Sequence, residues 1–370
     1  MIYKFKISKN VDSRIWNQNL LKSNYATFFQ TAEYLNFDLP NKFPLFIYVF
    51  NDNKQVCGQL ALIITKSRRA YSTTKFKRLI KLVSKLGNRG TWVSGPIIHT
   101  DNKKARLEIL KIFFKALEEI SEKYNLMILD GYSPPHDILV DEKYVKAFSS
   151  DNFQIENLET FVANLDQNID ELWKNVEKKA RNDVTRAKRR EISVREVNNK
   201  DDLKQFKILA KTWAKTKGIV IDDPLETFER DWRDYKTGIQ KFFLAYQNNE
   251  PISGLRVGCF NGIAYTHQVL NSYSKQTSLG GSLLTWSALE WAKNNGMKIY
   301  DFSGVKSNPK DENEWNGLRE YKKKWGGTVI PYYHFIKTKK KISYKLFRLL
   351  SKPDFFYRNY KKKRYQRPKK

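Results

Sequence analysis

Two α/β units in tandem, each a mixed β-sheet flanked by helices, are the fold that the sequence predicts. The chain has 370 residues, which corresponds to two domains at a typical length of about 150 residues each. Both halves show a strand hairpin, a helix with apolar residues at helical spacing and a returning strand. We therefore predict one domain over residues 1–155, a second over 156–338 and a separate basic segment over 339–370.

The first half begins its sheet with two apolar runs, Phe43–Phe50 and Gln55–Lys66, which a polar Asn-Asp-Asn-Lys turn joins into a hairpin. Lys103–Lys123 has apolar residues at intervals of three and four, which predicts an amphipathic helix. Leu126–Leu129 follows as a short buried strand, and Pro134-Pro135 break the chain after it.

The second half repeats this order. Its predicted helices are Asp170–Arg190, Asp201–Lys217 and Leu283–Asn294. Its predicted strands are Thr160–Leu165, Phe242–Tyr246, Ile252–Phe260, Ile263–Leu270, Lys298–Phe302 and Pro331–Ile336.

The charge of the chain is strongly positive. The formal net charge is +29, and such a surface attracts polyanions such as nucleic acid or anionic lipid. A general bias toward Lys is the alternative cause. The segment Lys341–Lys370 holds twelve Lys or Arg residues and one acid, interleaved with apolar residues. We leave open whether it is an interfacial amphipathic helix or a solvated, disordered extension.

The cysteine content indicates a reducing compartment. Cys57 and Cys259 are the two cysteines, and both lie in strand-like runs, which predicts buried thiols with neither a disulfide framework nor a zinc site. The chain begins without the pattern of a signal peptide, and none of its apolar runs approaches the roughly 20 residues of a spanning helix. We expect a cytoplasmic protein, with the inner face of the cell membrane as a place of peripheral association.

The stretch from Asn261 to Tyr333 carries the residues that indicate chemistry. It has the order strand, turn, helix, strand and basic loop, which is typical of the ligand-binding half of an acyl-transferring α/β unit. Such a reaction holds an amine against an activated ester or thioester and stabilises an oxyanion, so positioning and electrostatics supply most of the rate. Lys, Arg, Tyr and backbone N–H groups suffice for this, and we predict no metal site.

Two glycines, Gly280 and Gly281, come directly before an apolar helix. They would let backbone N–H groups approach a phosphate at the helix N-terminus, although a helix-opening turn explains them equally well. The pattern also falls short of the Arg/Gln-x-x-Gly-x-Gly/Ala loop of acetyl-CoA-dependent enzymes. Gln276 is present, but Leu279 stands where that loop has glycine.

Asp301 and His267 are the acid and base candidates. Asp301 stands at the end of a predicted strand, where open α/β sheets bind ligands, so it either orients a substrate amine or caps a turn. His267 lies in a strand two residues after Tyr265 and is a candidate general base, with a buried structural histidine as the alternative.

The basic candidates are Lys322, Arg181 and Arg186. Lys322 belongs to a run of three lysines bracketed by Tyr321 and Trp325, so one ammonium group could face a phosphate or a developing oxyanion. The two arginines lie on a basic helix face and could hold phosphates, or the face is simply solvated. We add three residues as substrate-binding candidates: Tyr265, Arg319 and Tyr321.

The order of elements resembles the Fem family of peptidoglycan-bridge aminoacyltransferases over residues 25–336. The segment Phe28–Tyr34 is similar to the family's N-terminal Phe-x-Gln-(Ser/Thr) motif. Thr160–Leu165, and then Leu172-Trp173 and Lys179–Asn182, resemble the strand and basic helix that open its second domain. The remaining likeness lies in Leu279–Trp291, Gly296–Gly304 and Gly317–Lys322, the last of which resembles a Gly-Leu-x-x-Phe-Lys element.

This resemblance implies two tandem acetyltransferase-like (GNAT-like) domains and transfer of an aminoacyl group from tRNA to an amine of a cell-wall precursor. It places the family's charge-stabilising lysine on Lys322 and the precursor's phosphates near Arg181 or Arg186. It implies no cofactor, because aminoacyl-tRNA is the donor substrate. Tyr321 and Trp325 stand where the family has Phe, its helical hairpin arm is missing, and a basic tail is added, so donor and acceptor stay open.

Three hypotheses follow. The first is aminoacyl transfer from tRNA to an anionic, lipid-linked precursor at the membrane face. The second is an acyl-CoA-dependent N-acyltransferase that acts on a sugar or amino sugar of a surface polysaccharide. The third is a non-catalytic protein on this fold that binds nucleic acid or membrane. The sequence does not indicate an oligomeric state.

Overall fold

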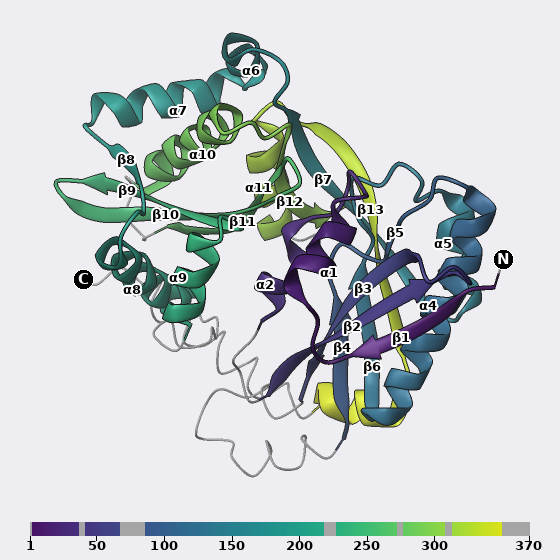
Figure 1. Ribbon diagram of the computed structural model, residues 1–370. Coiled ribbons are helices and arrows are strands. Elements are labelled where there is room, and N and C mark those ends of the chain that lie inside the picture. The colour runs from purple at the N-terminus through teal and green to yellow at the C-terminus, as the bar shows by residue number, and fades with distance from the viewer. Residues whose placement is uncertain are drawn as a thin grey trace. The chain divides into compact units, whose positions relative to one another are not determined.

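The computed structural model describes residues 2–36, 41–66, 86–217, 227–271, 277–307 and 313–349 (Figure 1). Within these residues the chain divides into two compact units. Unit 1 runs from the N-terminus to Leu158 and resumes at Pro331, and unit 2 spans Glu159–Ile330. The chain therefore returns to its first unit after it has completed the second.

The sheet of unit 1 has the strand order β1-β2-β3-β4-β6-β13, and the short strand β5 (Ile97–Ile98) pairs with β3. The strands are β1 (Lys4–Ser8), β2 (Lys42–Phe50), β3 (Val56–Thr65), β4 (Asn88–Trp92), β6 (Leu126–Tyr132) and β13 (Thr328–Thr338). The first four are joined antiparallel, β4 and β6 are parallel, and β13 runs antiparallel to β6.

The helices of unit 1 are α1 (Ser13–Leu20), the 3-10 turn η1 (Phe28–Gln30), α2 (Ala32–Leu35), α4 (Lys103–Lys123) and α5 (Glu142–Ser150). The Asn102 side chain caps α4 by accepting from the Ala105 N–H at 3.0 Å. The apolar stripe of α4 packs on the sheet because Ile109, Phe113 and Leu117 are buried in one cluster with strand residues. Residues 341–349, which follow β13, are also helical.

The sheet of unit 2 has the strand order β7-β12-β11-β10-β9-β8. The strands are β7 (Gln154–Asn164), β8 (Ser193–Glu196), β9 (Gln240–Gln247), β10 (Glu250–Phe260), β11 (Ile263–Asn271) and β12 (Ile299–Lys306). Strands β8 to β11 are antiparallel neighbours, and β11 and β12 are parallel. The helix between β11 and β12 supplies the crossover that parallel strands need.

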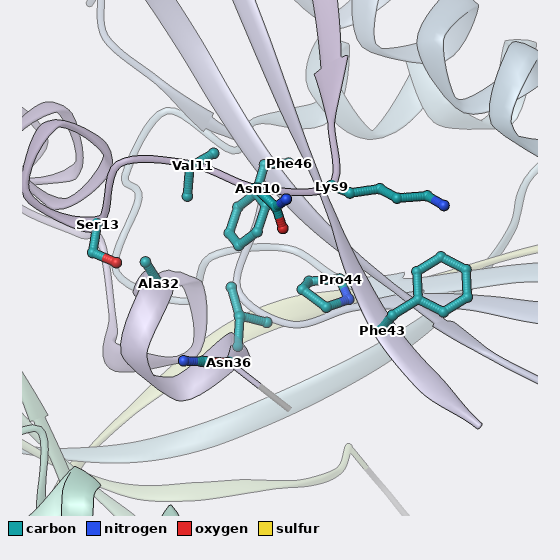
Figure 2. A pocket seen from close by; sticks show the side chains of 10 residues that line it. Lys9, Asn10, Val11, Ser13, Ala32, Asn36, Phe43, Pro44 and Phe46 are labelled. Carbon is teal, nitrogen blue, oxygen red and sulfur yellow. The ribbon is translucent and has the colours of Figure 1, made fainter. Parts of the chain in front are cut away.

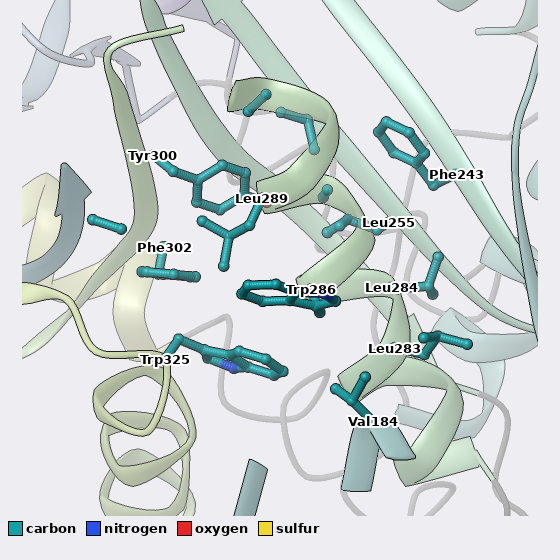
Figure 3. Close-up of a cluster of buried hydrophobic side chains, with 14 of the residues drawn as sticks. Val184, Phe243, Leu255, Leu283, Leu284, Trp286, Leu289, Tyr300, Phe302 and Trp325 are labelled. Carbon is teal, nitrogen blue, oxygen red and sulfur yellow. The ribbon is translucent and has the colours of Figure 1, made fainter. Parts of the chain in front are cut away.

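Helices cover both faces of this sheet (Figure 1). They are α6 (Ile169–Asn175), α7 (Lys178–Arg189), α8 (Lys200–Lys217), α9 (Phe228–Lys236), α10 (Thr277–Asn294) and α11 (Asn313–Lys323). Helices α7 and α10 contribute to one core, in which Trp286, Phe302 and Trp325 lie close together (Figure 3). Helix α8 covers the other face with Leu203, Phe206 and Leu209.

A buried ionic network joins α8 and α9 to the sheet. Asp231 forms ion pairs with Lys207 and, at 3.0 Å, with Arg256 of β10. The two cations hold the pKa of Asp231 at about 2 against the opposing effect of burial. Asp234 accepts from the Gln240 amide at 3.0 Å, and burial raises its pKa to about 6. Each buried charge here has a partner, as the low polarity of an interior requires.

The predicted fold class is confirmed, with local differences. The single helix predicted over residues 170–190 is two helices, because Val176 is extended (φ −67°, ψ 133°) and the Glu177 N–H donates to the Lys324 carbonyl at 2.8 Å. The apolar spacing continues across this break, since both helices bury their residues in one core. Both cysteines are free thiols; Cys259 is buried as predicted, whereas Cys57 is half-buried. Among the described helices, none is both long and apolar enough to cross a membrane.

Gly131 of β6 gives a test of the packing in unit 1. A Cβ atom at this position would lie 1.9 Å from the ring of Trp92, which is fully buried. We expect Gly131→Ala to lower the free energy of unfolding by ~1–3 kcal/mol, because the indole must move within a close-packed core. Urea titration measures this change. Gly317→Ala is the control, because nothing lies within 4 Å of its Cβ position in helix α11; equal destabilisation of both variants would contradict the packing argument.

Candidate active site

The strands β11 and β12 separate after a short region of pairing. Among the described residues, their register joins only Ile263–Tyr265 to Ile299–Asp301, although both strands continue beyond it. On its other edge β11 has a bulge, because Thr266 and Gln268 pair with adjacent residues of β10 and His267 is the extra residue. The bulge and the early end of pairing leave residues 265–269 partly exposed in the middle of a sheet.

The Gly280–Gly281 pair does not precede a helix, as the sequence analysis placed it, but lies in the first two turns of α10. A Cβ on Gly280 would lie 3.0 Å from both Ile252 and Ser253, and one on Gly281 would lie 2.9 Å from the Asn271 amide oxygen. The two glycines therefore let α10 approach β10 and β11 closely. Close packing of α10 on the sheet therefore explains why glycine stands at positions 280 and 281.

Asp301 lies inside β12 rather than at its end, and its side chain is fully buried. Its carboxylate accepts from the hydroxyl of Thr160 and, at 2.7 Å, from the backbone N–H of Ser303. Ser303 has φ +74°, in the left-handed region that few residues other than glycine adopt. The Asp301–Ser303 hydrogen bond thus stabilises a strained backbone and turns the carbonyl groups that follow.

Lys322 reaches those carbonyl groups from α11. Its Nζ donates to the carbonyl oxygens of Ser303 at 2.7 Å and Gly304 at 2.9 Å, and the residue is only 7% exposed. Burial lowers the pKa of Lys322 to about 8, and the negative charge of Asp301 opposes that effect. The group is therefore mainly an ammonium ion at neutral pH and loses its proton in mildly alkaline solution.

Two tyrosines flank this lysine. Tyr265 donates to the Ser303 hydroxyl at 3.1 Å, so β11 and β12 meet at the same turn. The hydroxyl of Tyr321 lies 2.7 Å from that of Thr285 and donates to the Gly281 carbonyl at 3.2 Å. Burial raises the pKa of Tyr321 to about 12. The structure thus brings five predicted residues around the splayed strands: Tyr265, Gly281, Asp301, Tyr321 and Lys322.

Arg319 is one step removed from this group. It pairs with Glu159, which precedes the Thr160 that binds Asp301. Its guanidinium group therefore supports the middle of β7, and the structure shows no other charged partner for it than Glu159 and Glu320 among the described residues.

The other predicted residues lie on different elements. Arg181 and Arg186 are on α7, where Arg186 is 3.9 Å from Asp183. Asp183 also pairs with Lys324 at 3.8 Å, and Lys324 lies over the rings of Tyr321 and Trp325. The basic helix is thus connected to the segment that carries Lys322. His267 occupies the bulge of β11 and is half-buried.

Three further residues, Thr160, Ser303 and Thr285, contact the predicted ones, although the sequence does not mark them as site residues. Ser303 follows Asp301 in an Asp-Phe-Ser-Gly sequence, whose composition is typical of a turn and gives a local signal. Thr160 and Thr285 have no such signal. They approach the site through sheet pairing and helix packing that join residues far apart in the chain.

Unit 1 contains an open pocket of its own, about 420 Å³ in volume, between the end of β1, α2 and β2 (Figure 2). Lys9, Asn10 and Ser13 supply polar groups, and Phe43 and Phe46 supply apolar surface. The residues predicted to take part in chemistry all belong to unit 2.

Comparisons with known proteins identify the class of this fold. A family model described as the FemAB family matches residues 271–352. A crystal structure of FemX superposes with a TM-score of 0.69 at 16% identity, over 92% of this chain and 99% of that one. A tandem GNAT protein from the clavulanic acid biosynthesis pathway superposes with a TM-score of 0.54 at 12% identity, over 91% of this chain and 98% of that one. The structure of L-PGS from Bacillus licheniformis superposes with a TM-score of 0.50 at 11% identity, over 93% of this chain and 99% of that one.

A search of curated proteins finds no match. The structural likenesses establish a GNAT-like fold. The predicted resemblance to the Fem family is confirmed: the FemAB match spans residues 271–352, which include α10, Asp301 and Lys322, and the fold is similar to that of FemX. Together the findings support a transferase of the acyltransferase class.

The titration of Lys322 predicts a pH-dependent contribution to stability. The unfolded lysine keeps its proton up to a pKa of 10.5, whereas the folded one releases it near 8. Between these values the unfolded chain binds more protons, so stability increases with pH. Relative to Lys322→Met, the free energy of unfolding of the natural protein should increase by about 2 kcal/mol from pH ~7.5 to ~9.5.

Urea titration at several pH values measures this difference. The comparison with Lys322→Met removes the contribution of the other titrating groups, including Tyr321. A constant difference between the two proteins across this range would show that Lys322 titrates normally in the folded state.

Proposed function

We propose that this protein transfers an aminoacyl group from aminoacyl-tRNA to an amine of a cell-wall or surface-polymer precursor. The FemAB match over the Lys322 region and the likeness to FemX support an enzyme of this type. The reaction forms a C–N bond and breaks the C–O bond to the ribose. The amine loses a proton, and the ribose oxygen gains one.

The observation that carries the proposal is the setting of Lys322. Four Lys or Arg residues are buried in the described part of the chain: Arg106, Lys207, Arg256 and Lys322. The first three have carboxylate partners in ion pairs. The described hydrogen bonds of Lys322 go instead to two carbonyl oxygens, which use two of the three N–H donors of an ammonium group.

In the proposed mechanism the third donor of Lys322 stabilises the oxyanion that forms when the amine attacks the acyl carbonyl. Asp301 holds the Ser303 turn and keeps the ammonium charged. Tyr265 and Tyr321 line the approach, and His267 accepts the amine proton. Arg181 and Arg186 bind phosphates of the precursor. Arg319 positions the middle of β7 through its ion pair with Glu159. No cofactor is required, because the donor is already an activated ester.

An acyl-CoA donor is the second candidate. The likeness in fold to a tandem GNAT protein favours it, because AcCoA is the ligand that the description of that structure mentions. The acceptor would then be a sugar or amino sugar of a surface polysaccharide. A third candidate is a non-catalytic protein that binds nucleic acid or membrane, for which Lys322→Ala would leave function intact and deletion of Lys341–Lys370 would abolish it.

Donor identity is the first test of the proposed function. The purified protein is incubated with a mixture of charged tRNAs that carry labelled amino acids and with a lipid-linked wall precursor. We expect label to enter the precursor and RNase treatment of the donors to abolish the transfer. Transfer that survives RNase and requires acyl-CoA would instead establish the second candidate.

Substitution of Lys322 tests the residue that carries the proposal. We expect Lys322→Ala to lower the transfer rate by about 10²–10³-fold, the usual effect of removing an oxyanion donor. Lys322→Arg retains the charge and should keep part of the activity. Lys324→Ala is the matched control, because it removes a neighbouring lysine that lies over Tyr321 and Trp325. Equal effects at positions 322 and 324 would argue against a special role for Lys322.

The pH dependence of transfer is a separate test. The charged form of Lys322 disappears as pH increases through about 8. The rate relative to Lys322→Arg should therefore fall above this pH, because arginine stays protonated. Both proteins are measured in the same buffers with the same donor. A constant ratio from pH ~7 to ~9.5 would exclude the ammonium of Lys322 from the rate-limiting step.

A further inference from the structure

The helix at residues 341–349 is attached to the sheet of unit 1. The backbone N–H groups of Lys339 and Lys340 both donate to the Met127 carbonyl of β6, at 3.0 and 3.2 Å. The side chain of Lys339 pairs with Glu118 of α4. In Figure 1 this helix is the yellow coil at the end of β6. Its position is therefore set by strand and helix contacts before its first turn.

The helix divides into an inner and an outer face. Its inner side bears Ser343, Tyr344 and Phe347, which are half-buried, and the last two rings stack at 6.5 Å. Its outer side bears an apolar row of three residues at i, i+4 and i+7: Ile342, Leu346 and Leu349 are 84%, 41% and 57% exposed. Beside that row, Lys341, Lys345 and Arg348 form a basic row at the same spacing, also exposed.

We propose that this outer face docks on an anionic lipid bilayer. Aliphatic side chains on an exposed helix enter the boundary between headgroups and acyl chains, and cations beside them pair with lipid phosphates. The sequence continues with residues 350–370, nine of which are Lys or Arg and one of which is acidic. The charge next to the helix thus has the sign that an anionic surface attracts.

A bilayer suits this face better than a nucleic acid does. RNA is bound by cations together with aromatic rings that stack on bases. Here the exposed large residues are aliphatic, and Tyr344 and Phe347 are on the half-buried inner side. Phosphate groups make no favourable contact with aliphatic side chains. Acyl chains do, because they remove apolar surface from water.

The fold of unit 1 also removes the free-energy cost of forming this helix when it binds lipid. Isolated helices of fewer than about 12–15 residues are marginal in water. This one is nucleated by the backbone hydrogen bonds of Lys339 and Lys340 to β6, so it need not fold on the lipid. The proposal does not depend on the acyl-transfer reaction, because lipid binding can be measured without any substrate.

The test is flotation of the full chain with vesicles of phosphatidylcholine, either alone or with about 30% phosphatidylglycerol. We expect binding to the anionic vesicles and little to the neutral ones. Replacing Ile342, Leu346 and Leu349 together by Ala retains every charge and should weaken binding at least tenfold. Replacing Lys341, Lys345 and Arg348 by Gln should weaken it by about fivefold per charge, since each cation near such a surface contributes about 1 kcal/mol.

Matched controls lie elsewhere in unit 1. Lys104, Lys111 and Lys115 are exposed on α4, and their change to Gln removes the same charge. Ile15, Leu21 and Ile138 are exposed apolar residues, 53%, 52% and 94%, and their change to Ala removes similar apolar surface. Both control variants should bind vesicles as the natural protein does.

A second measurement reports insertion directly. A fluorophore sensitive to polarity is attached to Leu346→Cys in a Cys57→Ser background, while Cys259 is buried and does not react. We expect a blue shift on anionic vesicles and quenching by nitroxide-labelled lipid. Vesicle binding that the alanine triple variant leaves unchanged, with no shift of the fluorophore, would overturn the proposal. So would loss of RNA binding, or of self-association, in that variant without loss of lipid binding.

Discussion

The hydrogen bonds from the Lys322 ammonium group to the Ser303 and Gly304 carbonyls are the interaction on which the candidate site depends. They tie α11 to β12 at the place where β12 leaves its pairing with β11. Asp301 stabilises the same turn, because its carboxylate accepts a hydrogen bond from the Ser303 N–H. Its negative charge also raises the pKa of Lys322 against the effect of burial. Loss of any one of these groups would leave the others buried without compensation, which is costly in a low-dielectric interior.

The other buried cations show why this arrangement is unusual. Arg106 with Asp137, and Lys207 and Arg256 with Asp231, form ion pairs that explain their burial as parts of the fold. Lys322 instead directs its described hydrogen bonds to two carbonyl groups, so one N–H donor of its ammonium group is left to respond to a developing negative charge, while burial lowers its pKa against the charge of Asp301. Active sites commonly shift pKa values in this way. The contrast within one chain supports a chemical rather than a purely structural role for Lys322.

Much of the fold could be predicted from the sequence, because apolar periodicity reports which faces are buried. The strands Ile252–Phe260 and Ile263–Leu270 and the helix over Lys103–Lys123 agree closely with β10, β11 and α4. The helix break at Val176 and the return of the last strand to unit 1 could not be predicted from the sequence, since both depend on tertiary contacts. For the site, residue type and strand order suggested Asp301 and Lys322. The partner Thr160 lies 141 positions from Asp301, a distance that local patterns do not span.

The positive charge of the chain has more than one cause. A general bias toward Lys would scatter cations over the surface, and the exposed Lys104, Lys111 and Lys115 of α4 fit that explanation. Such a bias does not account for Ile342, Leu346 and Leu349, because it would not align three exposed aliphatic side chains at helical spacing beside a row of cations. Exposed apolar surface that is rimmed by charge marks a place of contact on a folded protein. The charge near residues 341–349 is therefore best explained by the surface that this helix meets, whatever the origin of the charge elsewhere.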